Sequence, residues 1–189
     1  YAPLPCLQKC FRAAKHGVCH SCSWPCLSAS QKTKKRRDIV TELGKKLAEF
    51  YQSFGKAKKM VLSTSSEGKV SSRMMSVVLI DGKFYFQTDM NMRKYAQLKA
   101  NPHAALCIDN IQIEGICREV GRPLENEAFR SAFEECYKGS YDMYSSMESE
   151  RVFELSPDYI ERWIYIDGKP YTEVFDIEKG GYSLTEYKV

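Results

Sequence analysis

The sequence lacks the motifs by which many enzymes are recognised from a single chain. It contains no Walker phosphate loop, no Gly-x-Gly-x-x-Gly, no Gly-x-Ser-x-Gly and no His-Glu-x-x-His. Histidine is scarce, with only 3 in 189 residues. A histidine-based triad beyond the N-terminal region would have to use His103, which follows Asn101-Pro102 and is explained by a turn or a helix end. The sequence therefore argues against a catalytic triad.

Long apolar runs are also missing. No stretch reaches the ~18 consecutive apolar residues of a membrane-spanning helix. The N-terminal residues are polar and rich in cysteine, unlike the apolar centre of a signal peptide. We therefore expect a cytoplasmic protein that is not inserted in a membrane. A hydrophobic content of 43% still supplies a core and excludes wholesale disorder.

Acidic residues are absent from the first 37 positions. That segment carries eight Lys or Arg, whereas residues 38–189 carry 20 basic and 24 acidic residues. Five of the 8 cysteines also lie in the first 26 residues. The length allows about one domain plus an appendage. The sequence thus predicts a basic, cysteine-rich arm over residues 1–37 and a separate domain over residues 38–189.

The cysteines of the arm are spaced like metal ligands. Two closely spaced pairs fit a tetrahedral site, and a segment with so few apolar residues needs such a constraint to become ordered. Zinc or an iron–sulfur cluster is the expected occupant, although disulfides or free thiols remain alternatives. The first choice of ligands is Cys6, Cys10, Cys19 and Cys22, with Cys26, His16 and His20 nearby.

A dense basic run occupies residues 32–37. Beside a cysteine-rich knuckle it is compatible with contacts to nucleic-acid phosphates. The simpler interpretation is a solvated linker that leads into a helix. Aromatic residues that could stack on bases are nearly missing from the arm, and nucleic-acid binding is therefore the less favoured interpretation.

The domain from residue 38 onward reads as short strands with a few helices. Hydrophobic periodicity and turn residues, including the hairpin signal Asp81-Gly82, indicate a mainly β, α+β fold, namely a small antiparallel barrel with flanking helices. The predicted helices are residues 38–55, 93–99 and 123–138. The predicted strands are residues 60–65, 70–80, 83–89, 104–109, 111–121, 151–155, 159–166 and 171–177.

One ordered series of residues carries a family resemblance. Ser-Ser-Arg-Met-Met-Ser on a strand is followed by a hairpin, by Phe-Tyr-Phe-Gln-Thr, by Arg-Lys at a helix start, by Asn-Pro and by Ile-Glu-Gly. This order resembles the pyridoxamine 5′-phosphate oxidase-like flavoproteins, including their nitroimidazole-resistance and general-stress branches. The resemblance covers residues 38 to the low 120s and extends more loosely to the C-terminus. It implies an FMN-binding split β-barrel and a homodimer with the cofactor at the interface.

The resemblance also implies which residues bind FMN. A guanidinium, an ammonium and a hydroxyl suit a dianionic phosphate, and Arg73, Thr88 and Lys94 supply these groups. The resemblance further implies that the backbone of Met74, Met75 and Ser76 lies along the flavin. It places the Gln87 amide on the phosphate side, Arg93 as a second arginine there, and the Asn110 amide at the ring.

The chain also departs from the family pattern. Val78 stands where typical members have a lysine, and Gln112 replaces the arginine before Ile-Glu-Gly. These changes argue against oxidation of pyridoxamine phosphate and favour a divergent FMN oxidoreductase. Such an enzyme would pass electrons from a reduced nicotinamide or a protein donor to a small acceptor. The alternatives are a non-enzymatic split barrel that holds flavin or haem, and a metal-knuckle protein that binds nucleic acid.

Overall fold

The computed structural model describes residues 29–188, and side chains are described from residue 41 onward. The chain divides into two compact units, residues 1–36 and 37–189. The cysteines predicted to hold a metal lie outside the described residues.

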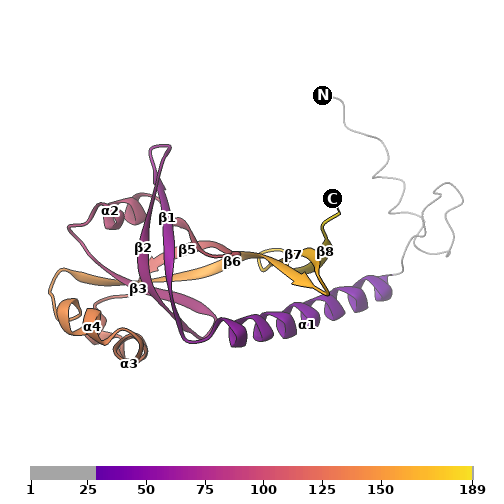
Figure 1. Ribbon diagram of the computed structural model, residues 1–189, viewed down its shortest axis with the longest axis horizontal. Helices are drawn as coiled ribbons and strands as arrows, with labels where there is room; N and C mark the ends of the chain where they lie inside the picture. The colour runs from indigo at the N-terminus through magenta and orange to yellow at the C-terminus, as the bar shows by residue number, and fades with distance from the viewer. Residues whose placement is uncertain (1–28, 189) are drawn as a thin grey trace, which may run out of the picture. The chain divides into compact units, whose positions relative to one another are not determined.

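A closed barrel forms the centre of this unit (Figure 1). Its strands follow the order β3-β2-β1-β4-β5-β6, and pairing of β3 with β6 closes the ring. All the pairings are antiparallel, and this confirms the predicted fold class. The strands are β1 (Ala57–Ser66), β2 (Lys69–Ile80), β3 (Lys83–Asp89), β4 (His103–Ile108), β5 (Ile111–Glu119), β6 (Glu150–Ile166), β7 (Lys169–Asp176) and β8 (Gly181–Glu186).

Strand β6 differs from the prediction because it is one continuous strand of 17 residues. Two separate strands were predicted here, on either side of Pro157. Pro157 instead sits where the register between β5 and β6 shifts, opposite Gly115. A proline is tolerated at such an irregularity because the ladder is already interrupted there. The long β6 can therefore pair with β3 at its start and with β7 at its end.

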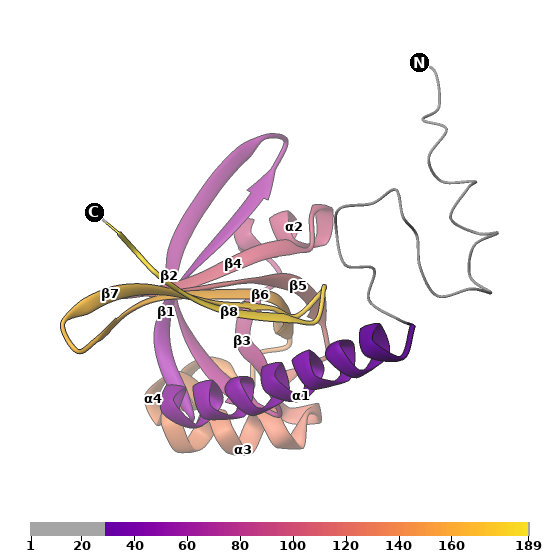
Figure 2. The same ribbon diagram turned by 90° about the vertical axis from the view of Figure 1, so that its right-hand side faces the viewer.

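Beyond the barrel, β7 and β8 extend the sheet from β6 (Figure 2). Strand β8 is not among the strands predicted from the sequence. Helix α1 (Ala29–Phe54) packs its apolar residues on this extension and on the barrel. The ring of Phe50 lies 5.4 Å from that of Phe175 in β7, and Phe54 lies 5.2 Å from Phe84 in β3. The helix begins nine residues earlier than the predicted start at residue 38, because residues 29–37 contain no glycine or proline to stop it.

Two helices cover the outer face of β2. The predicted single helix over residues 123–138 is instead a short 3₁₀ turn (Pro123–Glu125) followed by α3 (Glu127–Cys136). The break falls at Asn126, whose side chain caps α3 by accepting a hydrogen bond from the Phe129 amide at 3.0 Å. Helix α4 (Lys138–Tyr144) follows directly. Phe129 and Phe133 of α3 are buried with Val78 and Val152 in a second apolar cluster.

The remaining helix, α2 (Arg93–Ala100), connects β3 to β4 and packs on β1. Its buried residues are Gln97 and Leu98. Among residues 29–188, no helix combines the length and the apolar character that a membrane crossing requires.

Candidate functional site

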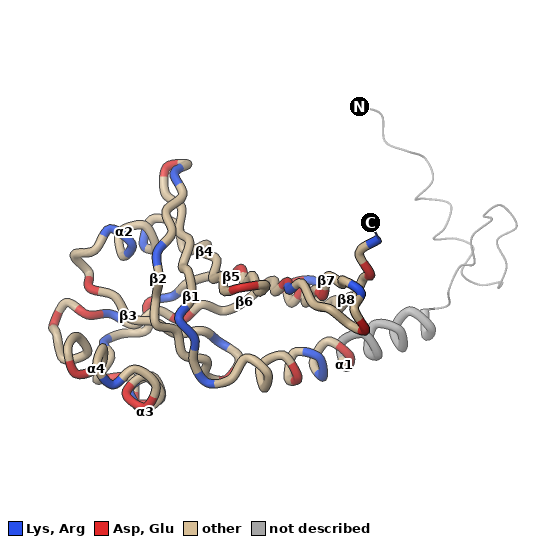
Figure 3. Tube along the Cα trace, in the orientation of Figure 1, with Lys and Arg blue, Asp and Glu red and all other residues tan. Residues whose placement is uncertain are grey.

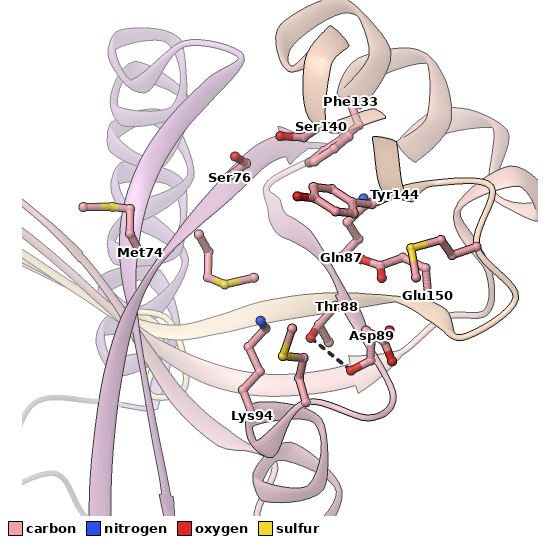
Figure 4. Close-up of a pocket in the computed structure, with 13 residues that line it drawn as sticks. Met74, Ser76, Gln87, Thr88, Asp89, Lys94, Phe133, Ser140, Tyr144 and Glu150 are labelled. Atoms are coloured by element: carbon pink, nitrogen blue, oxygen red, sulfur yellow. Dashed lines mark hydrogen bonds between the residues drawn. The ribbon is translucent and has the colours of Figure 1, made fainter. Parts of the chain in front are cut away.

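A cavity of about 340 Å³ lies on the outer face of β2, β3 and β6 (Figure 4). Helices α3 and α4 border it on one side, and α2 borders it on the other. This volume falls within the ~300–1,000 Å³ typical of small-molecule sites. The residues that line it are Met74, Met75, Ser76, Gln87, Thr88, Asp89, Met92, Lys94, Phe133, Ser140, Tyr144, Met147 and Glu150.

Six of the nine residues assigned to FMN binding from the sequence meet at this cavity. They are Met74, Met75, Ser76, Gln87, Thr88 and Lys94. Gln87 and Thr88 are buried, and the Gln87 Oε1 accepts a hydrogen bond from Ser145 Oγ at 2.8 Å. The Ser145 contact fixes the amide, because its oxygen is occupied and its NH₂ group remains available as a donor.

Lys94 supplies the positive charge of the cavity. Its amine points into the space between β2 and β3 in Figure 4. Within the described part of the chain, this ammonium has no hydrogen-bond or ion-pair partner. Burial lowers the pKa of Lys94 below its ordinary value, and the positive charge of Arg73 acts in the same direction. An anion beside this ammonium would compensate the cost of its burial.

Arg73 lies next to the cavity and does not line it. Its guanidinium donates to Thr64 Oγ1 at 2.7 Å and to Gln97 Oε1 at 2.9 Å. Arg93 is exposed and donates to Ser71 Oγ. These contacts tie α2 to β1 and β2. Lys and Arg residues of α2 are blue in Figure 3, and their positive charge favours anionic ligands.

Asn110 does not line this cavity. It is exposed in the turn between β4 and β5, where its amide donates to the backbone oxygen of Trp163. Within one chain it is therefore not brought together with Lys94. Val78, at the position of the missing family lysine, is fully buried under α3. The loss of that lysine thus coincides with a packed apolar contact.

The acidic side of the cavity is not among the features predicted from the sequence. Asp89 and Glu150 lie directly opposite each other on β3 and β6. Glu150 is only 5% exposed, and its burial and the nearby Asp89 raise its pKa to about 7. No short motif marks Glu150, because the closure of the barrel by β3 and β6 creates its environment.

The cavity opens to solvent along an apolar rim. Met74, Met92, Tyr144 and Met147 are exposed and also line the cavity. Flexible thioethers and an aromatic ring provide an adaptable apolar surface for a flat ligand. In the described residues, no group of three or more His, Cys, Asp or Glu side chains is arranged to hold a metal ion.

Comparison with known families identifies the domain. The family described as pyridoxamine 5′-phosphate oxidase matches residues 43–164, which is well over half of the chain. The chain belongs to this family. The match confirms the resemblance noted from the sequence, and it spans every residue that lines the cavity.

Solved structures with the same kind of fold are more distant. General stress protein 26 from Bacillus anthracis str. Sterne is 20% identical over 62% of this chain and 91% of its own, with a TM-score of 0.48. A pyridoxamine 5′-phosphate oxidase-related, FMN binding protein from Nostoc punctiforme PCC 73102 is 12% identical over 81% and 96%, with a TM-score of 0.49. A NimC/NimA family protein from Clostridium acetobutylicum is 15% identical over 68% and 84%, with a TM-score of 0.45.

Proposed function

We propose that this protein is an FMN-dependent oxidoreductase whose cofactor occupies the cavity between α2 and α4. The observation that carries the proposal is the Lys94 ammonium, which faces the cavity without a partner among the described residues, in a chain that belongs to the pyridoxamine 5′-phosphate oxidase family. A phosphate monoester is the anionic group of FMN that this ammonium would bind.

The residues around Lys94 fit a phosphate. The Thr88 hydroxyl lines the same cavity. Helix α2 begins at Arg93 without a side-chain cap, and the first amides of a helix favour anions. The apolar rim formed by Met74, Tyr144 and Met147 is suited to the flavin ring. The cavity therefore offers both hydrogen-bond donors and apolar surface.

A flavin supplies hydride and single-electron chemistry, and the protein positions and shields it. On this proposal, Lys94 and Thr88 hold the phosphate, Gln87 offers an amide donor and Ser76 a hydroxyl. The electron source would be a reduced nicotinamide or a protein donor, and the acceptor a small molecule. A packed Val78 in place of the family lysine supports a reaction other than oxidation of pyridoxamine phosphate.

The cytoplasmic location expected from the sequence stays a prediction. We also propose that the protein is a homodimer. The outer face of β1, β2 and β4 carries several small or apolar side chains, among them Ser63, Ala105 and the 73% exposed Val70, together with the exposed Lys59 and His103. This face continues to the exposed Met74 at the cavity. A second copy on it would cover apolar surface and the open side of the site. Light scattering should then give about twice the 21.7 kDa chain mass, whereas a monomer that fully retains FMN contradicts the dimer.

The visible spectrum of the purified full chain tests the cofactor. Oxidised flavin bands that bleach anaerobically when reduced nicotinamide or a reduced electron-transfer protein is added support the oxidoreductase. Flavin bands that no donor bleaches contradict turnover and favour a flavin-storage barrel. A Soret band favours the haem-binding alternative. A colourless protein that binds no added FMN contradicts the proposal.

The metal site of the arm also stays a prediction, because Cys6, Cys10, Cys19 and Cys22 lie outside the described residues. Elemental analysis of the same sample tests it directly. One equivalent of zinc or iron, lost when Cys19 and Cys22 are replaced by Ser, supports coordination. Less than one equivalent together with linked cysteines in non-reducing mass mapping contradicts it.

A further inference from the structure

Glu150 is a buried acid that faces the cavity without a protein partner. It begins β6 and lines the cavity wall that Lys94 also lines. In Figure 4 its carboxyl group points into the open space. Within the described residues, the carboxyl group accepts no hydrogen bond and forms no ion pair. Such a group is costly as an anion and is available to a ligand.

Its neighbour Asp89 is in the opposite situation. The Asp89 carboxylate accepts hydrogen bonds from the Asn91 amide at 2.7 Å, from Asn91 Nδ2 at 2.9 Å and from Ser149 Oγ at 2.9 Å. These donors lower the pKa of Asp89. Since two neighbouring carboxyl groups repel as anions, Glu150 is the member of the pair that takes up a proton more readily.

A bound phosphate would add a third negative group to this side of the cavity. The positive charge of Lys94 would attract the phosphate, but the carboxylates of Asp89 and Glu150 would repel it. The conflict disappears when Glu150 is neutral, because a protonated carboxyl group donates a hydrogen bond to an oxygen of the ligand. This deepens the proposed function, on which it rests. We propose that Glu150 contacts the ligand as a neutral carboxylic acid, so that the molecules in which Glu150 is ionised take up a proton from solvent when a phosphate monoester binds.

The charged groups that face Glu150 agree with this assignment. Asp89 on β3 disfavours its ionised form, and Lys94 on α2 favours that form. Helix α4 contributes Tyr144 and Ser140 to the cavity, and β2 contributes Met74, Met75 and Ser76, none of which is an Asp, Glu, His, Lys or Arg. A bound phosphate would occupy Lys94, which among the described residues stabilises the Glu150 anion.

Calorimetric titration of the flavin-free full chain with FMN measures the proton uptake that accompanies binding. The titration is run at pH 7.5 in two buffers that differ in ionisation enthalpy. The second pKa of a phosphate monoester is about 6, so FMN itself exchanges little proton at this pH. We expect net uptake of a substantial fraction of a proton. Riboflavin, which lacks the phosphate, should bind with little or no uptake.

The Glu150→Gln variant tests whether Glu150 is the group that takes up the proton. Gln mimics the neutral acid, so the uptake should vanish while FMN still binds. From pH 6.5 to 8.5, the FMN affinity of the wild type should fall roughly five- to ten-fold relative to that of the variant. The matched control is Glu154→Gln, on the same strand. Glu154 is also buried, but it accepts from Lys83 Nζ at 2.8 Å and lies outside the cavity. This control should keep the wild-type proton uptake.

The outcomes separate the two proposals. If the wild type binds no FMN, the proposed function fails and this inference fails with it. If FMN binds without proton uptake, or with the same uptake in Glu150→Gln, only the role of Glu150 is overturned. Should Glu150→Gln fail to fold, the contrast between FMN and riboflavin in the wild type still decides, because equal uptake for both overturns the inference.

Discussion

Arg73 on β2 donates to the Thr64 hydroxyl on β1 at 2.7 Å, and the same guanidinium reaches Gln97 of α2 at 2.9 Å. The two acceptors are themselves joined, because Thr64 Oγ1 donates to Gln97 Oε1 at 2.8 Å. This buried network fixes the helix that carries Lys94. In this structure, Arg73 therefore positions the site and adds positive charge beside it.

Replacing Arg73 by Met should lower stability as well as ligand affinity. The change removes charged hydrogen bonds to two buried side chains, and a loss of about 1–3 kcal/mol in the free energy of unfolding is expected. Urea denaturation of the flavin-free chain measures it. Arg93→Met is the comparison, because Arg93 is exposed and bonds only to Ser71 within the described residues. Equal stabilities for both variants and the wild type would contradict the network.

Gly115→Ala should destabilise the barrel at the junction of β5 and β6. A Cβ atom at this position would lie 2.2 Å from the backbone oxygen of Ser156. The backbone must shift to relieve this overlap, at a cost of about 1–3 kcal/mol or more. Thermal unfolding measures the loss.

Gly44→Ala on α1 is the control for Gly115. A Cβ atom at residue 44 meets no atom within 4 Å other than those of its chain neighbours and of its own helix backbone. Because alanine favours a helix over glycine by about 0.5–1 kcal/mol, this variant should be as stable as the wild type or more stable. Two equally tolerated substitutions would refute the close packing at Gly115.

The stability of the flavin-free protein should depend on the titration of Glu150. The pKa of this carboxyl is raised from 4.5 to about 7 in the folded state. Below pH 4.5 it is protonated whether the chain is folded or unfolded. As pH rises to about 7, ionisation increasingly favours the unfolded chain, and the free energy of unfolding decreases.

Glu150→Gln removes this titration. The variant should match the wild type near pH 5 and exceed its free energy of unfolding by about 1–3 kcal/mol at pH 8. Denaturation curves at the two pH values measure the difference. A constant difference across this range would show that Glu150 does not titrate as described.

The parts of the fold that local chemistry decides were predictable from the sequence. Asp81-Gly82 forms the turn between β2 and β3, with positive φ angles of 49° and 77°. Arg93 opens α2 as expected. The sequence predicts two strands on either side of Pro157, whereas β6 is continuous. The bulge that tolerates this proline depends on pairing with Gly115, about 40 residues away, and the local sequence does not indicate it.

The candidate site was predictable only where neighbours in sequence are neighbours in space. Ser76, Gln87, Thr88 and Lys94 come from one hairpin and the helix after it. Glu150 and Tyr144 reach the cavity from the far end of the chain. Their placement depends on closure of the barrel and on the packing of α3 and α4, which residue spacing does not encode.

The FMN affinity of Lys94→Met tests the central claim most directly. Lys99→Met is the matched control, since Lys99 lies on the same helix but outside the cavity, where it pairs with Glu119 at 3.2 Å. FMN and riboflavin are titrated into each flavin-free chain and into the wild type. The account predicts that Lys94→Met weakens FMN binding roughly ten- to hundred-fold, by loss of about 1.5–3 kcal/mol, and leaves riboflavin binding unchanged. Unchanged FMN affinity in Lys94→Met, or equal weakening in Lys99→Met, would contradict the account.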